Sequence, residues 1–305
     1  MDKIDKELLQ QIADLHQVPT GSYNIRKNGK SIGSASTKEI EIVPKTNKSG
    51  IDIIVKPNVK NKSVHIPVIV TEAGFKDLVY NDFYIGDGAD VFIVAGCGIH
   101  NDSTKASGHD GIHTFHIGKN SKVKYIEKHL GLGKDMGSKI LNPTTNIIME
   151  DGSEFEMETI QLGGVTSSNR ITNAKLKKDA KLIIKEKILT TDDQTATTKF
   201  KVVLVKDGSS VNVISRSVAK DNSQQKFVSK IVGDANCFGH VECDGIILNN
   251  ARIVSIPEID AKNVNASLVH EAAIGKIAGE EITKLMTLGL TQTEAEDLII
   301  KGYLN

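Results

Sequence analysis

The chain has 305 residues, enough for one large domain or two small ones, and its 38 basic side chains balance its 38 acidic side chains. Because this balance implies no strongly basic face, we expect no nucleic-acid partner. Three cysteines without disulfide-framework spacing and a charged N-terminus unlike a signal peptide predict a reducing, cytoplasmic setting, and no apolar run reaches the ~20 residues that cross a membrane.

The N-terminal part of the chain predicts a helix followed by a small β region. Apolar residues such as Leu8 and Ile12 recur near helical spacing over residues 1–17. Residues 20–65 are rich in lysine and contain only short β-like pieces. We therefore assign residues 1–74 to an N-terminal helix and a small β region.

Residues 75–276 are predicted to form a body of short strands. Tryptophan is absent, aromatic residues make up 4% of the chain, and 26 glycines accompany many β-branched residues. Turn signals separate the β-branched runs. These runs are Ala89–Val94, Ile112–Ile117, Val123–Ile126, Asn146–Met149, Phe155–Ile160, Leu182–Leu189, Phe200–Val205, Val211–Ser215, Phe227–Val232, Ile246–Leu248, Ala251–Ile256 and Val264–Val269.

The strands suit either a β-sandwich or a β-solenoid. Alternation within a run such as Lys181–Leu189 places one face inside the protein. Long helical patterns are missing from this region, which disfavours a doubly wound α/β sheet. Periodicity alone does not choose between sandwich and solenoid, because no strict short repeat is visible.

Residues 277–305 predict two helices. The first covers Ala278–Leu288 and ends at Gly289, and the capping-box pattern Thr291–Glu294 begins the second. Two interpretations of their apolar stripe remain open, packing against the β body or docking of a partner protein. The stripe comprises Ile282, Leu285, Met286, Leu288, Leu298, Ile299 and Tyr303.

A thiol, an imidazole and a carboxylate come from two strand-like segments near the C-terminus. Cys243 lies in Glu242–Gly245, and Glu271, next to His270, follows Cys243 by 28 positions. Coils of a β-solenoid repeat after roughly 20–30 residues, and neighbouring strands lie ~4.8 Å apart, so the segments could be neighbours. Sulfur with nitrogen and oxygen is a ligand mix that holds iron or an iron–sulfur cluster. The alternative is a buried cysteine and a surface His-Glu pair.

A second group of possible ligands lies upstream. Cys97, between two glycines, precedes four histidines, and the Cys-x2-His and His-x3-His spacings resemble a zinc site. Alternatively, the glycines indicate a turn, which would make Cys97 an accessible thiol with a lowered pKa, suited to accepting sulfur. The third possibility is a polar loop with an ordinary thiol. The histidines are His100, His109, His113 and His116.

Cys237 lies six residues before Cys243. In one extended strand this spacing separates the two thiols by ~20 Å. They could share a cluster only if the chain turns at Phe238-Gly239 or if two subunits meet there.

Motifs for nucleotide binding and for common enzyme classes are missing. There is no Gly-x4-Gly-Lys-Ser/Thr loop, so we expect no nucleotide on this chain. Neither a Gly-x-Ser-x-Gly elbow nor an HExxH motif occurs.

Several of these segments together resemble the SufB/SufD family of iron–sulfur cluster assembly scaffolds. The resemblance covers roughly residues 75–305. Within the family, the chain is most similar to the short SufB-like proteins of minimal SufBC-type systems. It implies a right-handed parallel β-helix. The matching stretches are Gly96-Cys97, Phe115–Asn120, Lys124-Tyr125, Ser215–Ser217, Glu242–Asp244, Ile256–Ile259, His270–Ala272 and Gly289–Tyr303.

The resemblance also implies roles for individual residues. Cys243 falls where SufB carries its cluster-building cysteine, and Glu271 where it carries an essential glutamate. His270 corresponds to the histidine that SufD contributes across the SufB–SufD interface, and Cys97 to the cysteine that receives sulfur. The C-terminal helices would dock a SufC-type ABC ATPase.

The chain departs from the SufB pattern in three respects. Its N-terminal region is shorter, Arg252 replaces a second cysteine, and Cys237 has no clear counterpart. These departures leave the sulfur donor open, with free sulfide conceivable.

The sequence therefore predicts a homodimeric scaffold, not an enzyme, that assembles a [4Fe-4S] cluster with an ATPase partner and passes it to apoproteins. Cys243 would supply the thiolate, His270 or Glu271 would complete the coordination, and Cys237 is a possible further ligand. Two rivals are a metal-dependent enzyme built on Cys97 and the histidines of residues 100–116, and a structural β-solenoid that binds a partner.

Overall fold

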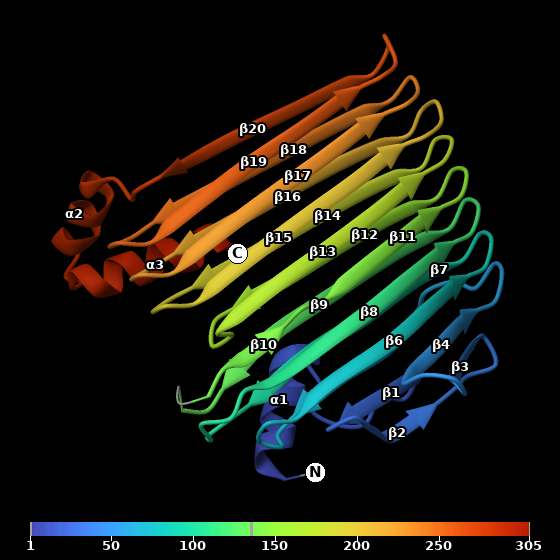
Figure 1. The fold of residues 1–305 in the computed structure, drawn as a ribbon, viewed down its shortest axis with the longest axis horizontal. Coiled ribbons are helices and arrows are strands. Elements are labelled where there is room, and N and C mark those ends of the chain that lie inside the picture. The colour runs from blue at the N-terminus through green and yellow to red at the C-terminus, as the bar shows by residue number, and fades with distance from the viewer. Residues whose placement is uncertain (1, 135–136, 305) are drawn as a thin grey trace.

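The computed structural model describes residues 2–134 and 137–304 as a two-sheet parallel β-solenoid (Figure 1). Each sheet has ten strands, and from β5 onward consecutive strands pass from one sheet to the other, except that β10 and β11 both belong to the same sheet. Neighbouring strands pair in parallel throughout this body. The parallel β-solenoid implied by the family resemblance is thus confirmed, and the sandwich is excluded.

The two sheets are named by their strands. Sheet A contains β1 (Ser22–Lys27), β2 (Lys30–Ala35), β5 (Lys62–Val70), β7 (Asp90–His100), β9 (Lys122–Leu132), β12 (Glu154–Leu162), β14 (Lys181–Thr190), β16 (Ser210–Ala219), β18 (Phe238–Ile247) and β20 (Ser267–Gly275). Sheet B contains β3 (Ile40–Pro44), β4 (Gly50–Val55), β6 (Lys76–Ile85), β8 (Ser107–Ile117), β10 (Lys139–Leu141), β11 (Thr144–Met149), β13 (Ser167–Leu176), β15 (Thr195–Leu204), β17 (Gln224–Gly233) and β19 (Arg252–Ala261).

Alternation along each strand builds the core between the sheets. In β14, Leu182 and Ile184 point inward and are buried, whereas Lys181 and Ile183 point outward and are exposed. Because every pair is in register, inward side chains form straight ladders that run the length of the solenoid. Most ladder positions are apolar, and stacked aromatic rings fill the N-terminal half, including Phe83, Phe115, Tyr125 and Phe155.

The first coils already belong to both sheets. β1 pairs in parallel with β5, and β4 pairs in parallel with β6, while β2 and β3 form the antiparallel edges. Helix α1 (Lys3–Ala13) packs on the outer face of sheet A over β5, β7 and β9, and its N-terminus carries a capping box formed by Asp2 and Asp5.

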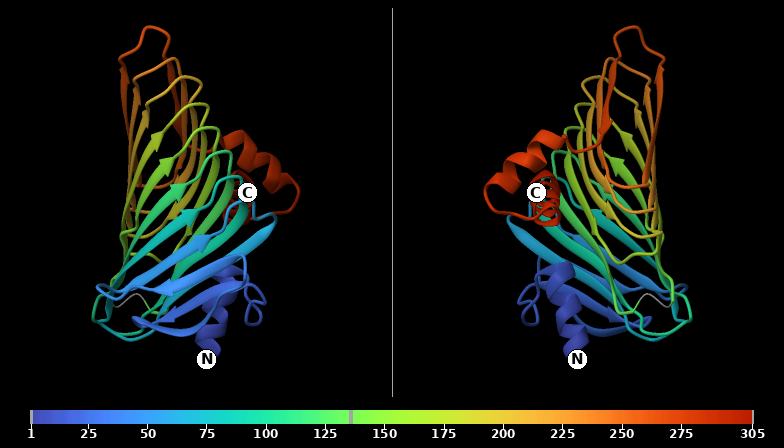
Figure 2. Two further views of the ribbon diagram at one scale, coloured as in Figure 1. Left: turned by 90° about the vertical axis from the view of Figure 1, so that its right-hand side faces the viewer. Right: turned by 90° about the vertical axis from the view of Figure 1, so that its left-hand side faces the viewer.

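The C-terminal helices α2 (Gly279–Thr287) and α3 (Gln292–Leu304) lie on the same outer side of the solenoid as α1 (Figure 2). The predicted capping box at the start of α3 is present, with the Glu294 backbone nitrogen donating to Thr291 Oγ1. Ile300 and Leu304 pack against Val218 and Leu248. Among the described helices, none is long and apolar enough to cross a membrane.

Candidate functional site

Cys243 lies inside the solenoid, near its C-terminal end. It occupies an inward position of β18, is 1% exposed, and pairs in register with Ser215 of β16 and Ala272 of β20. Burial raises the pKa of the Cys243 thiol to about 11, and the nearby Ser255 hydroxyl partly opposes this rise. The thiol is therefore protonated in the isolated chain, and deprotonation must accompany metal binding.

His270 shares the inner face with Cys243. It pairs with Val241, so it lies diagonally across from the cysteine on the next strand. Its Nε2 atom is buried and has no hydrogen-bond partner in the described part of the chain, and the same holds for Ser255 Oγ on β19. Buried polar atoms are rarely left unpaired, so two such atoms near one thiol suit a bound group.

Glu271 lies on the opposite face of sheet A. It pairs with Glu242, its side chain is 67% exposed, and its Oε2 atom lies 3.6 Å from His240 Nε2. The predicted neighbourhood of the two segments is thus real, but the register separates Glu271 from Cys243. Of the two predicted partners, His270 shares the inner face of sheet A with Cys243, and Glu271 does not.

Cys237 directly precedes β18 and is buried in the core at the other end of that strand from Cys243. Its sulfur lies close to Gly233, since a Cβ atom there would meet it at 3.0 Å. The chain does not turn back between the two cysteines, so they do not meet within one protomer.

The expectation of an exposed turn at Cys97 is wrong. Cys97 occupies an inward position of β7, is 2% exposed, and burial raises the pKa of its thiol well above the usual value. The flanking glycines have another cause, namely close packing of α1. A Cβ atom at Gly96 would lie 2.8 Å from the Ile12 carbonyl oxygen, and one at Gly98 would lie 2.8 Å from Leu8.

This packing predicts a destabilising effect of Gly96→Ala. The added methyl group would force α1 away from β7, at a cost of about 1–3 kcal/mol of unfolding free energy, as for other overpacked contacts. The control is Gly275→Ala, because nothing lies within 4 Å of a Cβ atom there. Urea unfolding of both variants measures the difference, and equal midpoints would refute the packing explanation.

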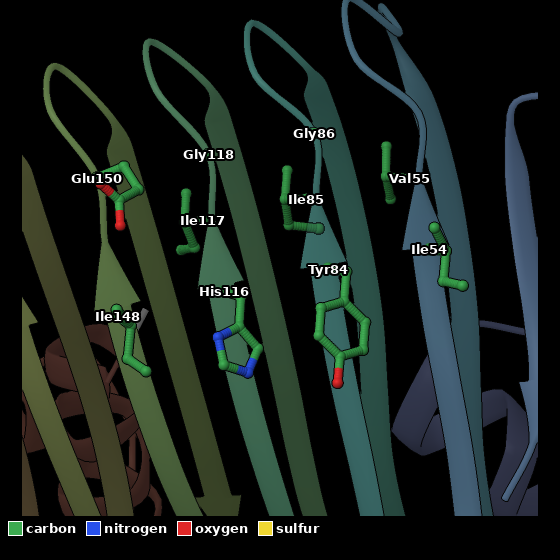
Figure 3. Close-up of a pocket in the computed structure, with 10 residues that line it drawn as sticks. All are labelled: Ile54, Val55, Tyr84, Ile85, Gly86, His116, Ile117, Gly118, Ile148 and Glu150. Carbon is green, nitrogen blue, oxygen red and sulfur yellow. The ribbon is translucent and has the colours of Figure 1, made fainter.

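The histidines near Cys97 do not form one cluster. His109 and His113 point inward from β8, whereas His116 lies on the outer face of sheet B, where it stacks on Tyr84 at 5.0 Å in a shallow groove (Figure 3). His100 lies 3.5 Å from Asp102. Within residues 2–134 and 137–304, no three His, Cys, Asp or Glu side chains are arranged to hold a metal ion. The predicted zinc spacing therefore does not correspond to an assembled site.

Inside the solenoid, sequence reasoning missed a buried charged network. Arg170 of β13 donates hydrogen bonds to Glu127 Oε2 and His129 Nδ1 of β9, and its Nε atom lies 3.9 Å from Glu186 Oε2. Burial opposes the charged form of Glu127, but Arg170 holds the pKa of its carboxyl well below the usual value. The sequence signal for this network was a charged residue at a position that the apolar–polar alternation of its strand directs inward. A buried charge requires a partner, so such a residue indicates an interior ion pair.

The network continues to Cys243 along one inward ladder of sheet A. Its rungs, in order, are Ala95, Glu127, Thr159, Glu186, Ser215 and Cys243. Ser215 and Thr198 both donate hydrogen bonds to Glu186. Cys97 stands on the adjacent ladder, paired with His129, and lines a small internal cavity with His109, His113 and Glu127. Polar side chains therefore connect the surroundings of the two cysteines.

The sequence of this chain matches a known protein family. The family described as "SUF system FeS cluster assembly, SufBD core domain" matches residues 80–303. The chain belongs to the SufBD family. The predicted family, whose description names iron–sulfur cluster assembly, is confirmed.

Archaeal members of the SufBD family are similar over most of this chain. An "Iron-sulfur cluster assembly SufBD family protein" of Archaeoglobus fulgidus is 33% identical over 233 residues, which are 75% of this chain and 61% of that protein. The similar proteins MJ0034 of Methanocaldococcus jannaschii and PH0883 of Pyrococcus horikoshii are each 28% identical, covering 83% and 90% of this chain and 79% and 84% of their own lengths. The chain thus spans under two thirds of the first of these relatives.

We expect this SufBD protein to lose stability in acid, because a histidine, His113, is buried in its interior. Burial lowers the pKa of His113 to about 4, so the folded protein keeps this ring neutral while an unfolded histidine protonates near pH 6.5. As the pH falls from 6.5 to 4, protonation of His113 therefore favours the unfolded chain increasingly, by about 3 kcal/mol in total. Above pH 6.5 the ring is neutral in both states, so the full stability of the folded chain is retained.

Urea unfolding at pH 7 and pH 4.5 measures this dependence. His113→Gln is expected to flatten the pH profile, whereas His16→Gln, at an exposed position, is expected to leave it unchanged. A His113→Gln profile as steep as that of the wild type would contradict the assignment.

The C-terminal helices of this SufBD protein present part of their apolar stripe to solvent. Met286, Leu288 and Leu298 are exposed, whereas Ile282, Leu285 and Ile299 are partly buried. The Tyr303 hydroxyl is buried against the solenoid and has no hydrogen-bond partner among the described residues. The stripe therefore divides into a packed part and an exposed part.

Proposed function

We propose that this chain is a homodimeric, cytoplasmic scaffold that builds an iron–sulfur cluster with a SufC-type ABC ATPase and passes the cluster to apoproteins. The cluster is cargo, of the [4Fe-4S] type, and the scaffold itself catalyses no reaction and binds no nucleotide. One observation carries the proposal, namely that Cys243 and the unpartnered His270 share the inner face at the end of the solenoid.

The exposed end of the solenoid supports a dimer. Neither β19 nor β20 has a buried residue, although the strands before them bury every second side chain. Ile256, Ile259 and Ile274 are each more than one third exposed. Such an apolar end is suited to cover by a second copy, which would bring further ligands to Cys243 and exclude water.

At the Cys243 end, the inner face offers one thiol, which would lose its proton on binding metal, and one imidazole per protomer. Thiolate holds iron firmly in clusters, and imidazole is a more labile ligand, as required for a cluster that is handed on. Glu271 and His240 form a separate outer pair, which we assign to the surface around the site. Cys237 remains a possible ligand only through contacts between copies.

Cys97 is the proposed acceptor of sulfur. In this step the Cys97 thiolate takes the outer sulfur of a donor persulfide and releases the donor thiol. Cys97 is enclosed, so the solenoid must open near β7 for this exchange, whereas free sulfide would enter the cluster directly without bonding to Cys97. The inward ladder from Glu127, which lines the same cavity as Cys97, to Cys243 supports movement of sulfur within the solenoid, because it offers polar side chains at successive rungs.

The C-terminal helices are proposed to bind the ATPase through the exposed residues Met286, Leu288 and Leu298, with Ile282, Leu285 and Ile299 beneath them. Because α3 packs against β16 and against the end of β18, a shift of the helix on ATP binding would be transmitted to the strands around Cys243. Tyr303 belongs to this packed contact.

Cluster transfer tests the proposed function. The chain would be co-expressed anaerobically with a SufC-type ATPase, purified, and mixed with an apo-ferredoxin with or without ATP. We expect ATP-stimulated appearance of holo-ferredoxin, lost when Met286→Asp and Leu298→Asp are combined. A purely structural solenoid would give no transfer in either condition.

A further inference from the structure

Three polar groups, Cys243, His270 and Ser255, lie on the inner face near the C-terminal end of the solenoid, and in the part of the chain that the structure describes the last two have a buried polar atom without a hydrogen-bond partner. Strand β19 of sheet B lies beside β18 and β20 of sheet A at the C-terminal end of the solenoid (Figure 1). Ser255 of β19 pairs in register with the buried Phe227 of β17, so its side chain points inward. A Cβ atom at Gly245 of β18 would lie 2.9 Å from Ile253 of β19, so the next inward positions of the two strands, Cys243 and Ser255, also face each other. The Ser255 hydroxyl accordingly acts to lower the pKa of the Cys243 thiol. Its oxygen is buried without a hydrogen-bond partner among the described residues.

The other hydroxyls around Cys243 are already engaged. Ser215, the direct neighbour of Cys243 on β16, donates its proton to Glu186 Oε1 at 3.1 Å. Ser217, one inward position further along, donates to the carbonyl oxygen of Asp244 at 3.3 Å. Ser255 therefore supplies the one hydroxyl of these three whose proton is not committed to an acceptor.

We infer that Ser255 is a positioning residue of the Cys243 site, where its hydroxyl donates a hydrogen bond to the sulfur held on Cys243. The inference rests on the proposed function, since it assigns a donor to the same cluster site. Sequence alone gave no sign of it, because Ser255 lies in β19, twelve positions beyond Cys243 and on the other sheet.

A hydroxyl donor changes a thiolate in two measurable ways. A hydrogen bond to an anionic sulfur stabilises the negative charge, which strengthens retention of metal by the thiolate at neutral pH. Hydrogen bonds to cluster sulfurs also shift the reduction potential, because they favour the more negative, reduced state. Loss of the Ser255 hydroxyl should therefore weaken metal retention and make the potential more negative.

The test compares Ser255→Ala, Ser255→Thr and Ser217→Ala with the wild type. Ser255→Thr keeps the hydroxyl, and Ser217→Ala removes an equally interior hydroxyl that is bonded elsewhere. After anaerobic reconstitution, we expect Ser255→Ala to lose iron to a chelator roughly tenfold faster, the size of one hydrogen bond to a charged acceptor. Its reduction potential should be more negative, while the other two variants should match the wild type.

A second probe separates failure of this inference from failure of the proposed function. Cd2+ alone would be titrated into the Cys97→Ser/Cys237→Ser background, in which Cys243 is the remaining thiol, and followed by thiolate-to-metal absorption. We expect Ser255→Ala to weaken Cd2+ binding there, again with rescue by Ser255→Thr, even in a preparation that builds no cluster. Unchanged Cd2+ affinity in Ser255→Ala, or an equal loss in Ser217→Ala, would overturn the role of Ser255.

Discussion

Cys243→Ser is expected to abolish cluster binding. Serine keeps the size and the inward position of the side chain, but its hydroxyl stays protonated and is a poor ligand for iron in a cluster. Among the described residues, His270 is the candidate ligand on the neighbouring strand next to Cys243, and an imidazole does not replace the thiolate that a cluster requires. After anaerobic reconstitution and desalting, the variant should retain less than about a tenth of the wild-type iron and sulfide.

The matched control is Cys237→Ser, which removes a buried thiol from the same strand region. Cys237 lies at the far end of β18, so its loss should leave iron and sulfide contents near those of the wild type. Equal losses in the two variants would mean that the cluster is not held at Cys243 in particular.

Arg170→Met is expected to cause the largest loss of stability. Arg170 is 5% exposed and pairs with Glu127, which is 4% exposed, so the substitution leaves a carboxylate buried without its cation. Breaking one partner of a buried ion pair typically costs about 3–5 kcal/mol, although replacing both partners costs much less. Urea unfolding should show this loss for Arg170→Met and a partial recovery when Glu127→Gln is added.

A surface ion pair gives the matched control for this prediction. Lys177 contacts Glu150 at 2.7 Å, but its side chain is 43% exposed. Lys177→Met should therefore change the unfolding free energy by less than about 1 kcal/mol. A similarly small change for Arg170→Met would show that the interior network is solvated and contributes little.

Strand positions and the C-terminal helices could be predicted from the sequence, because both depend on local pattern. β-Branched runs between turn signals overlapped most strands from β7 onward, although no run marked β10 or β13 and only the end of β18 was included. The Thr291–Glu294 box marked the start of α3. The spacing of Cys243 and Glu271 also indicated neighbouring coils correctly. The choice of a solenoid over a sandwich needed the family resemblance, since both architectures share the period of two.

Register and long-range packing could not be predicted in the same way. Adjacent positions on a strand face opposite sides, so an offset of one residue places Glu271 outside while His270 stays inside with Cys243. Glycines around Cys97 indicated a turn, but they reflect contact with α1, far away in the sequence. Arg170 reaches Glu127, and Ser255 faces Cys243, from the opposite sheet, and the sequence does not show which inward side chains meet across the interior.

Iron and labile sulfide content of the wild-type complex tests the central claim most directly. The chain would be co-expressed anaerobically with a SufC-type ATPase, and iron, sulfide and visible absorption would be measured on the purified complex. The account predicts a brown complex with iron and sulfide in equal, stoichiometric amounts. A colourless complex that contains both proteins but no iron or sulfide would contradict the claim that this solenoid carries a cluster.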